Sequence, residues 1–355
     1  MSKRKWISSA AIAALLGVIT FYGYHRWSGT AGAMRGEVLA LMPIDASAVI
    51  YLDFAELRSS PFLADLYKWA PRPQADADYA QFMHDTGFDF ERDLDRVAIA
   101  VEKRGEESSL FAVADGRFDR KKIASYAAKS GSIVKRDGHE IFSVPLSGSP
   151  RRISFTLLRT GRIAMTDDPD LAAYLGAKKG DADAAEWRTR FERLAGSPVF
   201  AVIRQDAGTG SALAAQAPGG LRSPQLSALL DQLQWITLAG KPENDGMRIV
   251  AEGECSAEAT VRQLTDLLNG IVVLAQAGLN DAKTRQQLDP AAREAYLELL
   301  KSADVSKIDR GETKSVRLVF DLTPKFLEAA RTTVPAAPVA PSAQKSAAGK
   351  PVAHR

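Results

Sequence analysis

An uncharged run near the amino terminus constrains this chain more than any other feature. No charged residue occurs between Trp6 and Tyr24. As an α-helix rising about 1.5 Å per residue, this run is roughly 28 Å long, which nearly matches the roughly 30 Å hydrocarbon core of a bilayer. Three basic residues directly precede it, and aromatic rings crowd both of its ends, as is typical of membrane interfaces. The segment Trp6–Tyr24 is therefore predicted to be a transmembrane helix, with the lipid bilayer as its partner.

A cleaved signal peptide is the alternative to a permanent anchor. Ala31-Gly32-Ala33 has the small-residue spacing of a cleavage site. The apolar run is longer than the about 7 to 15 residues of a signal peptide, however, and this site lies well beyond its end. An uncleaved single-pass anchor with a short linker, residues 1–34, is favoured. Because more basic residues lie before the helix than after it, we expect the N-terminus inside the cytoplasmic (inner) membrane and the globular domain extracytoplasmic.

Basic residues are concentrated at the two ends of the chain. The 355 residues carry a formal charge of +3, with 46% hydrophobic and 25% charged residues, as in ordinary globular proteins. Four basic residues lie around the anchor and four in the tail, so the folded middle carries −5. A body of this charge repels a nucleic-acid backbone, and we expect no nucleic-acid partner.

The pattern of apolar segments predicts an α+β fold in duplicate. A compact apolar strand, Ala48–Leu52, precedes helices, a hairpin, a helix and further strands, and a similar order begins again at Val199–Ile203. Asp137-Gly138 is a strong signal for a two-residue hairpin turn. We expect two repeated β-α-β-β-α-β-like units, residues 35–195 and 196–330, with mostly antiparallel sheets. The two units either share one sheet or face each other across a groove.

Two further segments are interpreted from their composition. The apolar run Leu267–Ala275 is too short to span a bilayer, and polar residues interrupt its surroundings, so we predict a buried core helix there. Residues 331–355 are rich in alanine, proline and lysine and cannot build a core. We predict that they form a disordered tail.

The sequence contains no motif that specifies a catalytic, cofactor-binding or metal site. Its histidines are scattered, and the single cysteine, Cys255, cannot form an intramolecular disulfide. Ser132 and Lys135 match an S-x-x-K pattern, but they lie in a predicted strand, where residues three apart face opposite sides. Gly208–Leu213 lacks the third glycine of a dinucleotide-binding turn. We therefore predict no catalytic, cofactor-binding or metal residues and no cofactor.

Four acids form a weak constellation. Asp53, Asp115, Asp206 and Glu252 lie at or near predicted strand ends, in matching places of the two units. If those strand ends converge, the carboxylates could bind a cation or a basic partner. Their alternative role is to begin or form turns, as aspartate commonly does.

The leading functional hypothesis is a non-catalytic binding or scaffolding module of the cell envelope, whose partner is an envelope protein or ligand. The alternative is an extracytoplasmic hydrolase with a carboxylate-lined cleft between the two units. A third hypothesis is a carrier of lipids or apolar ligands, lined by Phe62 and Trp69.

The opening of the globular part resembles that of a known group of proteins. Leu41-Met42-Pro43-Ile44-Asp45-Ala46, then Tyr51-Leu52-Asp53, then Leu57 and Ser60-Pro61-Phe62 resemble an uncharacterised bacterial family of membrane-anchored proteins with a domain of unknown function. Its members have an amino-terminal membrane segment and duplicated α+β units. The resemblance implies an envelope location and no assigned catalysis, and it carries no active-site residues.

Overall fold

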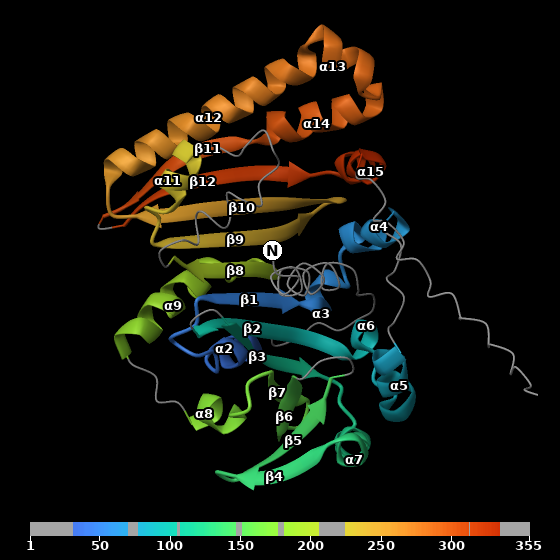
Figure 1. Cartoon of the computed structure of the whole chain (residues 1–355). Coiled ribbons are helices and arrows are strands. Elements are labelled where there is room, and N and C mark those ends of the chain that lie inside the picture. The colour runs from blue at the N-terminus through green and yellow to red at the C-terminus, as the bar shows by residue number, and fades with distance from the viewer. Residues whose placement is uncertain are drawn as a thin grey trace, which may run out of the picture.

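One antiparallel sheet organises the part of the chain that the structure describes. The computed structural model describes residues 31–69, 77–104, 107–146, 151–176, 181–205, 224–311 and 313–333. Its sheet has 12 strands in the order β11-β12-β10-β9-β8-β1-β2-β3-β7-β6-β5-β4 (Figure 1). The strands are β1 (Ala48–Asp53), β2 (Leu94–Arg104), β3 (Glu107–Gly116), β4 (Ser132–Arg136), β5 (His139–Pro145), β6 (Arg152–Arg159), β7 (Arg162–Thr166), β8 (Val199–Arg204), β9 (Trp235–Glu243), β10 (Gly246–Cys255), β11 (Asp304–Arg310) and β12 (Thr313–Leu322).

Helices connect the strands and pack on both faces of the sheet, and because the strand pairs are antiparallel, the fold class is α+β. The helices are α2 (Ala31–Leu39), α3 (Phe54–Leu57), α4 (Pro61–Trp69), α5 (Ala77–Thr86), α6 (Phe90–Asp93), α7 (Arg120–Ser130), α8 (Leu171–Gly176), α9 (Asp181–Arg193), α11 (Pro224–Leu230), α12 (Glu258–Asn280), α13 (Ala282–Gln287), α14 (Pro290–Ser302) and α15 (Pro324–Thr333).

The two halves of the chain share this sheet, which is one of the two arrangements expected from the sequence. At the middle, β1 pairs with β8, with Tyr51 opposite Phe200. The order β1-β2-β3-β7 leads to one edge and β8-β9-β10-β12 to the other, and in each half helical residues follow the third strand of this series. The strands do not interleave as in a split β-α-β-β-α-β unit, because successive strands mostly pair with each other and every pair in the described sheet is antiparallel.

Short turns explain why consecutive strands become antiparallel neighbours. Asp137 and Gly138 have φ of 51° and 80° and join β4 to β5, at the turn that the sequence predicts. Gly161, with φ of 77°, joins β6 to β7. Because glycine has no Cβ, it adopts these positive φ angles without strain.

Successive side chains along each strand point to opposite faces of the sheet, so the hydrophobic core is divided between the two faces. On one face, side chains of β1, β2, β3 and β8 pack against α2, α8 and α9, and Tyr51, Phe111, Trp187 and Phe200 are nearly fully buried there. On the other face, α4 and α15 form one hydrophobic cluster with β10, and α11 and α12 form another with β9, β10 and β12. The sheet is therefore a central layer between two sets of helices.

Two predictions about the carboxyl-terminal half are corrected. The run Leu267–Ala275 lies in α12 as a helix, but it is not a buried core helix, because Val273 and Leu274 are 62% and 72% exposed. The predicted tail begins too early, since α15 continues through residues 331–333. Leu327 of this helix packs against α4 in a contact that joins distant parts of the sequence.

The predicted anchor Trp6–Tyr24 lies outside the described residues, as do residues 334–355 of the predicted tail. Among the helices that the structure describes, none is both long and apolar enough to cross a bilayer.

Candidate functional site

The acids selected from the sequence do not converge in the described fold. Asp53 ends β1, Asp115 lies in β3 and Glu252 lies in β10, while Asp206 is outside the described residues. Neighbouring strands are about 4.8 Å apart, and β10 is the third strand from β1, so Asp53 and Glu252 are roughly 14 Å apart across the strands alone. These three carboxylates therefore do not line the common cleft that the hydrolase alternative requires.

Asp53 and Asp115 belong to a row of alternating charges that crosses four neighbouring strands. Asp53 of β1 is opposite Arg96 of β2, Arg96 is opposite Asp115 of β3, and Asp115 is opposite Arg162 of β7. All four side chains are buried. Arg96 Nε donates to Asp53 Oδ2 over 2.8 Å. Arg162 Nε and Nη2 donate to the two oxygens of Asp115 over 2.6 and 2.7 Å.

This charge row, defined by those four residues, is best explained as a structural element. Opposite charges on adjacent strands attract each other, and buried ions persist in proteins only when they are paired. The hydrogen bonds that Arg162 donates to Asp115 raise the pKa of Arg162, which keeps this guanidinium charged. Tyr51 adds a donor to the row, since its hydroxyl lies 3.2 Å from Asp53 Oδ2.

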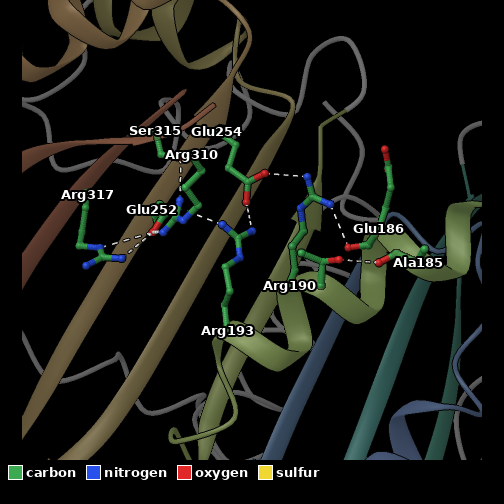
Figure 2. A network of polar contacts seen from close by, with 10 residues as sticks. Ala185, Glu186, Arg190, Arg193, Glu252, Glu254, Arg310, Ser315 and Arg317 are labelled. Carbon is green, nitrogen blue, oxygen red and sulfur yellow. Dashed lines mark hydrogen bonds and ion pairs between the residues drawn. The ribbon is translucent and has the colours of Figure 1, made fainter. Parts of the chain in front are cut away.

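A second polar network lies on the same face in the other half of the sheet (Figure 2). We call it the arginine cluster, and its members are Arg190, Arg193, Glu252, Glu254, Arg310 and Arg317. Glu252 accepts hydrogen bonds from Arg193 Nη1 at 3.3 Å, Arg317 Nη2 at 3.1 Å and Arg310 Nη2 at 3.0 Å. One carboxylate thus holds three guanidinium groups that come from three different elements.

Glu254 anchors the other side of the arginine cluster. Its side chain is 1% exposed, and it accepts hydrogen bonds from Arg190 Nη2 at 2.6 Å and from Arg193 Nη2. The guanidinium of Arg190 also lies over the ring of Trp235, with Cζ 3.9 Å from the ring centroid. This cation–π contact and the ion pair fix the position of Arg190.

Local geometry explains part of this arrangement. Arg190 and Arg193 are three residues apart on α9, so both reach the same side of that helix. Glu252 and Glu254 are two residues apart on β10, so both face α9. The i,i+3 and i,i+2 spacings were available in the sequence. Arg310 and Arg317 could not be identified as partners from the sequence, because only the pairing of β10, β11 and β12 brings them to Glu252.

The charges of the arginine cluster are mutually stabilised. Burial opposes ionisation of Glu252, but hydrogen bonds and attraction from Arg310 and Arg317 outweigh it and lower the pKa of this carboxyl group. The hydrogen bonds that Arg310 donates to Glu252 in turn raise the pKa of Arg310. Burial lowers the pKa of Arg190, against the attraction of Glu254. A carboxylate held ionised in this way is a poor general acid.

A groove of about 390 Å³ lies between α2 and α9. Its lining includes the buried apolar side chains of Leu39, Met42 and Trp187. The exposed charged residues Arg188 and Glu192 also line it. An apolar surface with a few charged groups at its edge is typical of a site that binds a small molecule or an apolar side chain.

Arg35 lines this groove and fixes α2 to the sheet. Its guanidinium lies 4.8 Å from the ring centroids of both Tyr51 and Phe200. It donates to the carbonyl oxygens of Leu194 and Ala195 over 2.7 and 2.6 Å. Burial lowers the pKa of Arg35. No local sequence signal identifies these two hydrogen bonds, because the carbonyl groups that accept them lie about 160 residues away.

Other candidates from the sequence have structural explanations. Ser132 and Lys135 are exposed residues of β4. Cys255 is buried, its Sγ lies 3.4 Å from the carbonyl oxygen of Ala257, and burial raises the pKa of its thiol. Phe62 packs in the cluster between α4 and α15, so it does not line a ligand space. Gly208–Leu213 lies outside the described residues. Among the residues that the structure describes, no three histidine, cysteine or acidic side chains are grouped so that they could bind a metal ion.

The comparisons with known proteins concern the fold. No protein family matches this sequence, and no curated protein is significantly similar to it. Crystal form III of TP0453 aligns with a TM-score of 0.44 and 11% identity, over 84% of this chain and 98% of that one. Form IV aligns with a TM-score of 0.43 and 11% identity, over 85% and 100% of the two chains. Form I has a TM-score of 0.42 and 8% identity, over 83% and 96%.

Proposed function

We propose that this chain is a non-catalytic binding module of the cell envelope. In this proposal Trp6–Tyr24 holds it in the inner membrane, and the folded part lies outside the cytoplasm. The groove between α2 and α9 binds an apolar group of an envelope protein or ligand.

The groove is the observation that carries this proposal. Its volume of about 390 Å³ is within the range of small-molecule sites, about 300 to 1,000 Å³. It lies against α2, the first described helix after the predicted anchor. The described carboxylates that could have served a hydrolase are instead held by arginines, in the charge row and in the arginine cluster.

Protease treatment of intact spheroplasts tests the location. We expect external protease to degrade the folded part in spheroplasts, and we expect the chain to remain in the membrane fraction after a high-salt wash. A folded part that stays protected until the spheroplasts are lysed would overturn the proposed orientation.

A pair of substitutions tests the groove. Ala184 lines it, whereas the neighbouring Ala185 is exposed and does not. We expect Ala184→Trp to fill the groove and abolish the rise in Nile red fluorescence that the wild-type protein produces. Ala185→Trp should leave that rise unchanged, and both variants should keep the wild-type thermal midpoint within a few degrees. Equal fluorescence from the two variants would show that the dye binds elsewhere and would remove the groove from the proposal.

A further inference from the structure

The arginine cluster carries more positive than negative charge. Four guanidinium groups contact only two carboxylates, those of Glu252 and Glu254. The exposed carboxylate of Glu186 is a further acid that acts on Arg190. The four arginines and the carboxylates of Glu252 and Glu254 together carry a net charge of +2. If Glu186 is included, the net charge is +1. This local excess stands out because the folded middle of the chain as a whole is acidic.

Several donors of the cluster have no acceptor among the described residues. A guanidinium has five N–H groups in a planar fork. Within the described chain, Arg193 Nε, Arg310 Nε and Arg317 Nη1 donate to no protein atom, whereas the other nitrogens of these side chains bind the two carboxylates. The Nε of Arg190, which is buried, also lacks a hydrogen-bond partner.

Solvent reaches the cluster, although its carboxylates are buried. The side chains of Arg193, Arg310 and Arg317 are 26%, 29% and 35% exposed, whereas those of Glu252 and Glu254 are 7% and 1% exposed. The two buried carboxylates therefore hold these three guanidinium groups and leave part of each side chain open to solvent. A ligand that binds them meets side chains that are already ordered, which reduces the entropy lost on binding.

From this geometry we infer that the arginine cluster is a phosphate-binding site. A phosphate group carries a charge of about −1.5 to −2 at neutral pH, and its oxygens accept several hydrogen bonds at once. These properties match a small excess of positive charge and several unused donors on convergent forks. The site is separate from the groove, since Arg310 and Arg317 belong to β11 and β12 and do not line it.

Calorimetric titration with sodium phosphate tests this inference on the full-length chain in a neutral detergent, at constant ionic strength set with sodium chloride. Arg317→Gln removes the most exposed member of the cluster. Arg248→Gln is the matched control, because Arg248 is an exposed residue of β10 whose charge is balanced by Glu243 and Asp321. We expect the wild-type protein and Arg248→Gln to bind phosphate equally, and Arg317→Gln to bind at least about tenfold more weakly.

A second measurement does not need Arg317→Gln and covers the case in which that variant does not fold. Millimolar phosphate should raise the thermal midpoint of the wild-type protein and of Arg248→Gln above the value in chloride of equal ionic strength. Absence of both heat and stabilisation in the wild-type protein would overturn the inference, and so would equal binding by the two variants.

Short-chain phosphatidic acid, used as a monomer, distinguishes a lipid headgroup from free phosphate. Tighter binding than that of inorganic phosphate would assign the site to a lipid, and weaker binding would assign it to a free phosphate. Short-chain phosphatidylcholine, whose phosphate is a diester shielded by choline, is the control and should not bind. Because these titrations use purified protein, they can fail without affecting the proposed location, and the groove test can fail without affecting them.

Discussion

Buried arginines decide much of what individual residues do in this protein. Arg162 is 5% exposed and donates two hydrogen bonds to Asp115, which itself is 7% exposed. A buried ion pair of this kind adds little stability relative to an apolar pair, but breaking it is costly, because one charge is then left buried without a partner. The acids of the charge row are therefore explained by the arginines opposite them.

Asp115→Asn should be strongly destabilising. The substitution removes the carboxylate that accepts two hydrogen bonds from the buried Arg162 and leaves the partly exposed Glu37, 3.5 Å away, as its ion-pair partner, so we expect a loss of about 3 kcal/mol in the free energy of unfolding. Urea denaturation followed by circular dichroism measures this loss. Asp309→Asn is the control, because Asp309 pairs with Lys314 on the surface and should barely change the midpoint. Equal midpoints for the two variants would contradict the structural role of the row.

The stability contributed by Glu252 should depend on pH. Its pKa in the folded protein is below the ordinary value of 4.5, so its contribution is fully present above pH 4.5 and is lost as the pH falls through the lower folded value. At neutral pH, Glu252→Gln should cost about 3 to 5 kcal/mol, and the difference from wild type should shrink below pH 4.5.

The thermal midpoints of the wild-type protein and of Glu252→Gln, measured between about pH 7 and pH 3, check this expectation. Glu258→Gln is the control, since Glu258 is an exposed partner of Arg262 on α12. A gap between wild type and Glu252→Gln that stays constant with pH would mean that the carboxylate charge is not what matters.

At the scale of elements, α12 shows how a helix can be predicted while its environment is not. Its first half is anchored by Val261 and Leu264, which are both 2% exposed, whereas Val273 and Leu274 further along are mostly exposed. A run of apolar residues predicts burial only if another element covers it. In the described fold, α11 and the sheet form a hydrophobic cluster with the first half of α12, and α12 also contacts α13 and α14.

Substitutions in the two halves of α12 should therefore differ in effect. Because Val273 and Leu274 are already in contact with solvent, the double variant Val273→Ser/Leu274→Ser should change the free energy of unfolding by less than about 1 kcal/mol. Leu264→Ala should cost about 2 to 5 kcal/mol, because it creates a cavity. Urea midpoints measure both, and a large loss in the double variant would show that another part of the protein covers this face.

At the scale of the whole molecule, the pairing of β1 with β8 makes two halves of the chain into one sheet. Tyr51 of the first half stacks on Phe200 of the second, with ring centroids 5.1 Å apart. Arg35 lies over both rings. Since a continuous sheet and a shared hydrophobic cluster cross this junction, the two halves should unfold together.

Phe200→Ala tests that cooperativity. Phe200 is 1% exposed, and its loss should cost about 3 to 5 kcal/mol. Native-state hydrogen exchange should show the same loss of protection for the slowest amides of β2 and of β9, which lie on opposite sides of the junction. A loss confined to β9 and its neighbours would indicate two independently stable halves.

The sequence by itself determined the local elements and their order. The apolar strands Ala48–Leu52 and Val199–Ile203, the turn at Asp137-Gly138 and the helical character of Leu267–Ala275 were all predictable, because each depends on residues within a few positions of one another. The repeated order of elements also suggested that two related halves could share a sheet.

Only the tertiary structure decided which residues meet. Glu252 is joined to Arg193, Arg310 and Arg317 across 58 to 65 residues of sequence, and Arg35 reaches Ala195 across 160. Such contacts depend on the order and register of the strands and on where each helix packs, which local patterns do not specify. For the same reason Asp53, Asp115 and Glu252 do not converge in the described fold, whereas four arginines distant in sequence meet around Glu252 and Glu254.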